Sequence, residues 1–117
     1  MKRKTLFTLF AFICAASIVA QSSMYSPGEA AKHVGETATI TGTVDGVHQS
    51  GKGNIFLNMG GTYPNQAFTA SITARSASKF RNPQQYEGRI VAVSGKITLY
   101  RGKPEIIVTS LSQISEK

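Results

Sequence analysis

The sequence predicts an all-β fold, a small closed barrel of five strands in Greek-key order that follows one short helix. From residue 37 onward, apolar and polar residues alternate, which is the period of strands with one buried face. The segments 35–44 and 88–97 (GETATITGTV and GRIVAVSGKI) echo each other, and each holds a glycine inside its strand, at Gly42 and Gly95. Such a glycine usually marks a bend, a bulge or a close backbone approach, and bent strands allow a small barrel to close.

Residues 1–20 are expected to be a signal peptide that is removed on export. Three cations at positions 2–4 precede an apolar run over Leu6–Ala16, and small residues lead to Ala20. A charged start, a short apolar stretch and a small-residue cleavage site are typical of secretory leaders. The alternative is an uncleaved membrane anchor, although the run is short for crossing a bilayer. We therefore expect a periplasmic or secreted protein, with no stable membrane insertion after cleavage.

Residues 21–34 are expected to form a tether and a short helix. Ser26 can cap this helix, Pro27 suits its first position, and Glu29 can complete a capping box. Gly35 is expected to end it after about two turns. Because so short a helix is not stable alone, we expect it to close one end of a larger structure.

Residues 35–117 are expected to form one domain with five alternating segments. The segment 76–88 separates the third strand from the fourth, and Pro83 limits any helix there to about one turn. Phe80 and Tyr86 are its expected anchors in the core. Five strands with an element between the third and fourth match the Greek-key barrel known as the OB-fold. The expected strands cover residues 37–47, 54–59, 67–74, 90–100 and 105–109.

Several runs in this domain resemble the bacterial OB-fold family of nucleic-acid-binding domains. The most specific are the FLN-x-G pattern at 56–60 and the Y-x-G-K-P-E-I pattern at 100–106, and the likeness extends over nearly all of residues 35–114. The resemblance implies an OB-fold and, by analogy, a nucleic-acid ligand. It implies no catalytic residue.

Composition and motif spacing argue against an enzyme. Thirteen Lys and Arg residues oppose six Asp and Glu residues, and without the leader's three cations the chain carries +4, which permits a polyanionic partner without requiring one. The single cysteine, Cys14, lies in the leader and excludes a disulfide framework or a cysteine zinc cluster. His33 and His48 lack the spacing of metal ligands, the carboxylates are scattered, and no nucleophile elbow occurs. We expect no catalytic residue, no metal and no cofactor, and two ordinary surface histidines.

The candidate binding surface follows from strand alternation. OB-folds bind ligands over their second and third strands and between the first and fourth inter-strand loops. Alternation points Phe56, Asn58 and Tyr100 outward and Leu99 inward. Exposed rings beside cations suit single-stranded nucleic acid, because rings stack on bases while Lys and Arg contact phosphates. The candidate nucleic-acid-binding residues are Lys52, Phe56, Asn58, Tyr63, Tyr100, Arg101 and Lys103.

Other interpretations of these residues stay open. Phe56 can belong to the core, Tyr63 can pack its own loop, and Arg101 can be part of a simple hairpin turn. The expected function is an exported, non-catalytic module for single-stranded DNA or RNA. The alternatives are a periplasmic protein that binds a small or carbohydrate-like ligand or a cation in envelope stress, and a subunit that docks on an exported enzyme.

Overall fold

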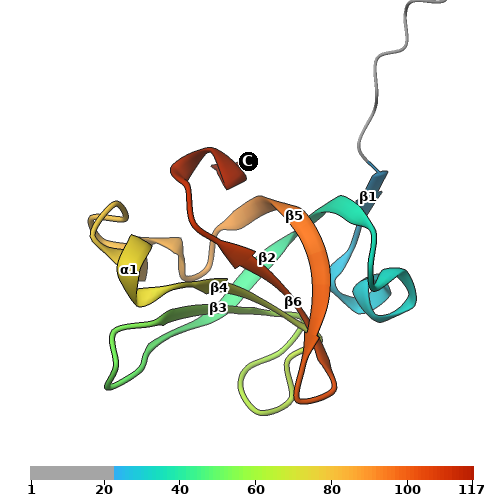
Figure 1. The fold of residues 1–117 in the computed structure, drawn as a ribbon, viewed down its shortest axis with the longest axis horizontal. Helices are drawn as coiled ribbons and strands as arrows, with labels where there is room; N and C mark the ends of the chain where they lie inside the picture. The colour runs from blue at the N-terminus through green and yellow to red at the C-terminus, as the bar shows by residue number, and fades with distance from the viewer. Residues whose placement is uncertain (1–22) are drawn as a thin grey trace, which may run out of the picture.

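The fold is given by a computed structural model, which describes residues 23–117. The expected signal peptide lies outside the described residues. Within them, no helix is both long and apolar enough to cross a membrane. The elements are β1 (Ser23–Tyr25), the 3₁₀ helix η2 (Pro27–His33), β2 (Thr37–Gln49), β3 (Ile55–Met59), β4 (Phe68–Ile72), α1 (Ala74–Ala77), the 3₁₀ helix η3 (Pro83–Tyr86), β5 (Ile90–Tyr100), β6 (Lys103–Val108), the 3₁₀ helix η4 (Leu111–Gln113) and β7 (Ile114–Glu116) (Figure 1).

Five of these strands close into a barrel. The order is β2–β3–β4–β6–β5, and β5 returns to pair with β2. Neighbours are antiparallel except β4 and β6, which run parallel with Thr69 opposite Glu105. The crossover that this parallel pair requires makes the order a Greek key, so the predicted five-stranded barrel is confirmed.

The two long strands, β2 and β5, each change partner part-way along their length. β2 pairs with β5 as far as Thr43 and with β3 from Val44, where an extra residue forms a bulge. β5 pairs with β2 as far as Lys96 and with β6 from Ile97. The two echoing segments therefore lie antiparallel to each other, and each strand serves two parts of the barrel wall.

The glycines inside these strands serve two different purposes. A Cβ at Gly95, where φ is 155°, would lie 2.7 Å from Cγ2 of Ile106. A Cβ at Gly42 would lie 2.6 Å from Cγ of Pro27. Gly95 thus permits close packing across the bend of β5, whereas Gly42 makes room for the N-terminal helix. The bend of β2 belongs to its bulge rather than to Gly42.

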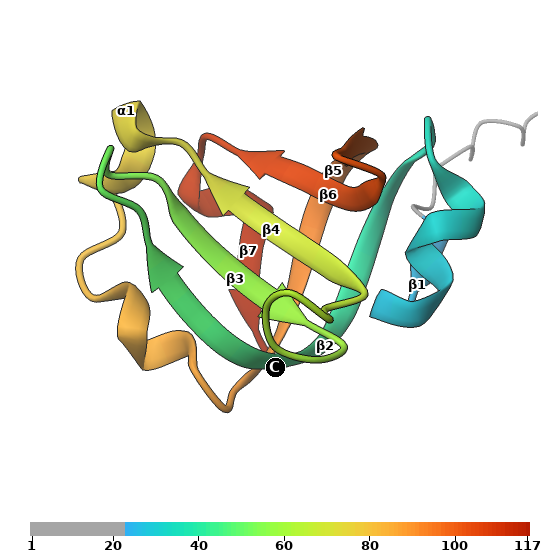
Figure 2. The ribbon, with the colours of Figure 1, turned by 90° about the horizontal axis from the view of Figure 1, so that it is seen from below.

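The helix η2 lies at one end of the barrel, opposite α1 (Figure 2). The predicted capping box of Ser26 and Glu29 is present, and in it Oε1 of Glu29 accepts a hydrogen bond from the backbone N–H of Ser26 at 2.8 Å. Ala30 is fully buried, and η2 contacts β2, β4 and β6. The expectation that this helix closes one end of the barrel is therefore confirmed.

Four short elements have no counterpart among the elements expected from the sequence, and one of them is η4. Residues Ser23–Tyr25, in the expected tether, form β1 and pair in parallel with β2. β7 pairs with β5, and α1 begins where the third strand was expected to continue. A strand of three residues is too short to show alternation, which is why β1 and β7 leave no signal in the sequence.

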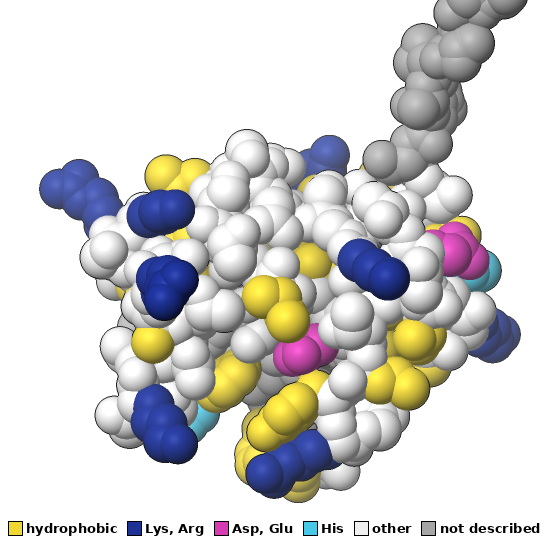
Figure 3. Space-filling view, in the orientation of Figure 1, with side chains coloured by type: hydrophobic (Ala, Val, Ile, Leu, Met, Phe, Trp, Pro, Cys, Tyr) yellow, Lys and Arg dark blue, Asp and Glu magenta, His cyan; other side chains and the backbone are white. Residues whose placement is uncertain are grey.

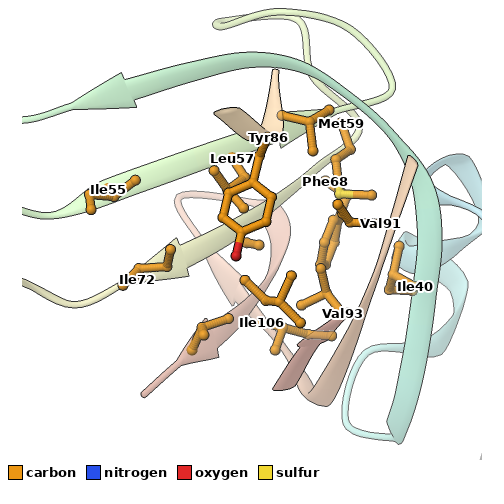
Figure 4. Packing of buried hydrophobic residues seen from close by; sticks show 14 of the residues in the cluster. Ile40, Ile55, Leu57, Met59, Phe68, Ile72, Tyr86, Val91, Val93 and Ile106 are labelled. Atoms are coloured by element: carbon orange, nitrogen blue, oxygen red, sulfur yellow. The ribbon is translucent and has the colours of Figure 1, made fainter. Parts of the chain in front are cut away.

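The barrel interior is packed with apolar side chains (Figure 4). Phe80 and Tyr86 are buried against it, as predicted. The expectation that Leu99 faces inward is wrong, since 55% of this residue is exposed. Leu99 lies beyond the bend of β5, where the strand pairs only with β6 and no other strand covers it. The largest fully buried side chains are Phe68, Ile40, Ile55, Leu57, Met59, Ile72, Ile97 and Ile106.

Candidate nucleic-acid interface

A groove of about 540 Å³ crosses the outer face of β3 and β4. The residues between these two strands, called the 60–67 loop below, and the β5–β6 hairpin form one side of it, and the paired β2 and β3 strands form the other. Figure 3 shows the corresponding notch along the lower edge of the molecule, with a Lys or Arg side chain on the lobe to each side. The lining residues are His48, Phe56, Asn58, Tyr63, Pro64, Gln66, Thr69, Tyr100, Arg101, Lys103, Pro104 and Glu105.

Six of the seven candidate residues from the sequence lie in this one groove, and Lys52 does not. Lys52 is exposed on the β2–β3 turn, which hydrogen bonds between Ser50, Gly53 and Asn54 hold closed. That turn precedes β3, whereas Asn58 stands near the other end of the strand. Lys52 could therefore contact only a ligand that extends beyond the groove.

Two tyrosines stand on the side formed by the loop and the hairpin. Tyr63 is 74% exposed and Tyr100 is 57% exposed. The guanidinium carbon of Arg101 lies 5.2 Å from the centroid of the Tyr100 ring, a cation–π arrangement, and φ of Arg101 is 52° in the hairpin turn. The rings and the guanidinium are accessible to a ligand in the groove.

A third aromatic ring lies on the opposite side. Phe56 is half-buried on the outer face of β3, and the His48 ring lies 6.2 Å from it at an interplanar angle of 10°. Phe56 thus faces outward, as the alternation of the strand predicts. His48 lies one residue beyond the expected strand 37–47, yet it belongs to β2 and pairs with Phe56 across the ladder.

Lys103 connects the hairpin to the 60–67 loop. Its Nζ donates hydrogen bonds to the carbonyl oxygens of Pro64 (2.9 Å) and Gln66 (3.0 Å). Oδ2 of Asp45 fixes the other end of the loop by accepting a hydrogen bond from the N–H of Gly61 at 2.7 Å. An ammonium group has three donors, so two of those of Lys103 are occupied within the protein.

The floor of the groove is polar but uncharged. Nε2 of Gln66 donates to Oγ1 of Thr69 at 3.2 Å, and that hydroxyl donates to Oδ1 of Asn58 at 2.9 Å. All three side chains are buried, although Asn58 and Thr69 point out of the barrel. The floor is therefore a fixed chain of amides and a hydroxyl.

Glu105 places a carboxyl group in the same groove. Burial raises the pKa of this half-buried group above its usual value, because desolvation disfavours the charged form. A carboxylate here opposes a polyanionic ligand, so the local charge of the groove is less positive than its cations alone suggest.

The sequence did not reveal every residue of the groove. Thr69 could have been found from its pairing with Asn58, since both occupy outward positions on adjacent strands. Gln66 gave no signal, because the path of an irregular loop cannot be read from alternation. The remaining residues that were missed are His48, Pro64, Pro104 and Glu105.

A second polar cluster lies near η2, away from the groove. Glu36 accepts hydrogen bonds from Tyr25 (2.7 Å) and from Nδ1 of His33 (2.8 Å), and these two bonds lower the pKa of Glu36. The rings of Tyr25 and His33 are stacked with centroids 3.6 Å apart. His33 is thus a hydrogen-bonded surface histidine. Residues 23–117 hold no group of three or more metal-ligating side chains.

Comparisons with known proteins support the fold. No protein-family model matches the chain, and no curated protein matches it. It is similar to a putative aspartyl-tRNA synthetase from Leishmania major Friedlin, with a TM-score of 0.54 and 13% identity over 91% of this chain and 22% of that one. It is also similar to the aspartyl-tRNA synthetase from Entamoeba histolytica, with a TM-score of 0.51 and 15% identity over 95% of this chain and 28% of that one. The chain has the OB-fold. It spans only about a quarter of the length of these enzymes, and at such low identity the OB-fold is what they share.

Proposed function

We propose that this OB-fold is an exported, non-catalytic module that binds single-stranded nucleic acid in the groove over β3 and β4. The observation that carries the proposal is the set of accessible rings along the groove, Tyr63, Tyr100 and Phe56, with Arg101 beside Tyr100. Bases of an unpaired strand stack on such rings, and the guanidinium contacts the phosphates between them. The face and loops used are those through which OB-folds bind oligonucleotides.

The cations contribute in different ways to this proposal. Arg101 is exposed and forms no salt bridge with any described residue, so it is the main phosphate contact. Lys103 acts chiefly on the 60–67 loop through its two carbonyl partners. Lys52 contacts only a strand long enough to reach the β2–β3 turn.

Fluorescence anisotropy with labelled single strands of about 12 nucleotides, within the site size of an OB-fold, tests the proposal. We expect binding that weakens as salt is raised, because phosphate contacts release counterions. Tyr100→Ala should weaken binding by about 1–3 kcal/mol, the contribution of one base-stacking contact. Lys32→Ala and Lys117→Ala are the controls, since neither residue lines the groove. Undetectable binding at low salt, or equal losses in the controls, would refute the proposal.

Export is proposed from the leader-like residues 1–20, and it places the module in the periplasm or outside the cell. The mature chain should begin near Gln21. The intact mass of the protein recovered from outside the cytosol measures this directly. A retained N-terminus, or a lipid mass on Cys14, would contradict it.

An oligosaccharide is the second candidate ligand, and the uncharged floor favours it. Asn58, Thr69 and Gln66 offer hydrogen bonds suited to hydroxyl groups, while Glu105 opposes a polyanion. OB-folds also bind oligosaccharides on this face. Binding that is insensitive to salt and is competed by neutral oligosaccharides would favour this candidate over nucleic acid. Capture of an exported enzyme without either ligand would favour the docking-subunit alternative.

A further inference from the structure

One buried acceptor in the groove has no partner. Oε1 of Gln66 forms no hydrogen bond within the described residues, and Gln66 is only 8% exposed. Leaving a buried polar atom unsatisfied is destabilising, and such atoms are rare in folded proteins. Oε1 itself has almost no exposed surface, but Gln66 lines the groove, so a ligand that displaces this side chain slightly can bring a donor to the oxygen.

The hydrogen bonds of the floor determine what it can offer to a ligand. A hydroxyl has one hydrogen, and Thr69 uses it toward Oδ1 of Asn58 while accepting from Nε2 of Gln66. This direction leaves the Nδ2 of Asn58 as a donor and the Oε1 of Gln66 as an acceptor. The three side chains of the floor therefore hold one free donor and one free acceptor and carry no charge, while the carboxyl of Glu105, opposite Thr69 in the ladder, lies in the same groove.

We propose that this floor reads the edge of one unpaired nucleobase, so that the groove discriminates between bases instead of only following the backbone. The inference rests on the proposed function. A phosphodiester has only acceptors and cannot satisfy Oε1 of Gln66, whereas the Watson–Crick edge of each nucleobase carries both a donor and an acceptor. Single-stranded recognition commonly combines such edge contacts with stacking of the base face on aromatic rings.

The surroundings of the floor support an inward base and an outward backbone. Tyr63, Tyr100 and Phe56 stand beside the floor, while Arg101 is exposed on the hairpin at the rim. Lys103 and Asp45 hold the 60–67 loop at both ends, so the position of Gln66 is set before a ligand arrives. A preformed site loses less conformational entropy on binding, which favours selective recognition.

The test measures dissociation constants for four homo-oligonucleotides of one length and for an abasic strand of that length. We expect the best and worst base to differ by roughly 5- to 100-fold, the discrimination typical of good base-edge contacts, and the abasic strand to bind weakly. Gln66→Met should bring the four constants together without lowering the free energy of unfolding, because it removes an unsatisfied buried acceptor. Gln84→Met is the matched control, since Gln84 is an exposed glutamine outside the groove, and it should retain the discrimination.

A second pair of variants keeps the test independent of the stability of Gln66→Met. Thr69→Val removes the hydroxyl that orients both amides and should abolish discrimination, whereas Thr69→Ser keeps that hydroxyl and should preserve it. Equal affinities of the natural protein for all four bases would overturn base reading while leaving nucleic-acid binding intact. Discrimination that survives both Gln66→Met and Thr69→Val would show that the floor is not the reader. Absence of binding to every strand would refute the proposed function itself.

Discussion

The substitution Gly42→Ala tests how the N-terminal helix is seated on the barrel. The added Cβ would lie 2.6 Å from Cγ and 2.8 Å from Cδ of Pro27, closer than real Cβ contacts, and 3.4 Å from Cε of Met59. The proline ring is stiff and belongs to η2, so the helix must shift, and the burial of Ala30 beneath it is disturbed. Overpacking of this kind typically destabilises by about 1–3 kcal/mol. Replacing glycine with alanine in an extended strand offsets roughly 0.5–1 kcal/mol of this, so we expect a net loss of up to about 2.5 kcal/mol.

Urea unfolding of the natural protein and four variants separates the steric effect from a general effect of the substitution. Gly46→Ala is the matched control in the same strand, because its Cβ would meet only Cγ2 of Thr62 at an ordinary 3.7 Å. Its midpoint should rise slightly, because alanine at an unstrained strand position stabilises by roughly 0.5–1 kcal/mol. Pro27→Ala combined with Gly42→Ala should lose less stability than the sum of the two single changes, since removing the ring relieves the clash. If Gly42→Ala is no more destabilising than Gly46→Ala, or if the double-mutant cycle shows no coupling, the steric argument fails.

Two further predictions concern the charges of the groove. Arg101→Ala should reduce the slope of log affinity against log salt by about 0.7, the value for one phosphate contact on a single strand. Lys103→Met should leave this slope nearly unchanged and should instead speed amide hydrogen exchange in the 60–67 loop. Equal slope changes in both variants would show that Lys103 also contacts phosphate. Because burial raises the pKa of Glu105, the carboxyl of Glu105 stays protonated to a higher pH in the native protein than in the unfolded chain. The neutral carboxyl therefore stabilises the native protein at low pH, and this stabilisation is lost as pH rises from the usual pKa of 4.5 through the raised pKa. Glu105→Gln should therefore gain stability over the natural protein at neutral pH and not at about pH 3, as measured by urea unfolding, and a gain that does not depend on pH would contradict this.

The sequence predicts the barrel well because its long strands are amphipathic. The bounds of β5 agree with the predicted residues 90–100, since alternation and flanking glycines mark both ends. Alternation also places Phe56 and Asn58 on the outer face of β3. It fails at Leu99, because the phase of a strand says which side a residue faces and not whether anything covers that side.

The polar groups of the groove were harder to predict than its aromatic residues. Lys103 was expected to contact a phosphate, and its two carbonyl partners come from a loop about 40 residues earlier in the chain. The orphan oxygen of Gln66 likewise depends on how that loop folds over β3 and β4. Such contacts are set by tertiary structure, and no local pattern in the sequence encodes them.

The pairing of β2 with β5 has a consequence for the order of folding. It joins residues far apart in the chain, as shown by the hydroxyls of Thr39 and Ser94, which lie 2.8 Å apart but are separated by 55 positions. Contacts of such long range form slowly, because the chain must lose the entropy of closing a large loop before the contacts stabilise it. The groove draws its sides from the β2–β3 and β5–β6 hairpins, which are in place together only when the barrel closes. Ligand binding therefore reports on the completed barrel, and a refolding chain should acquire it in its last and slowest step.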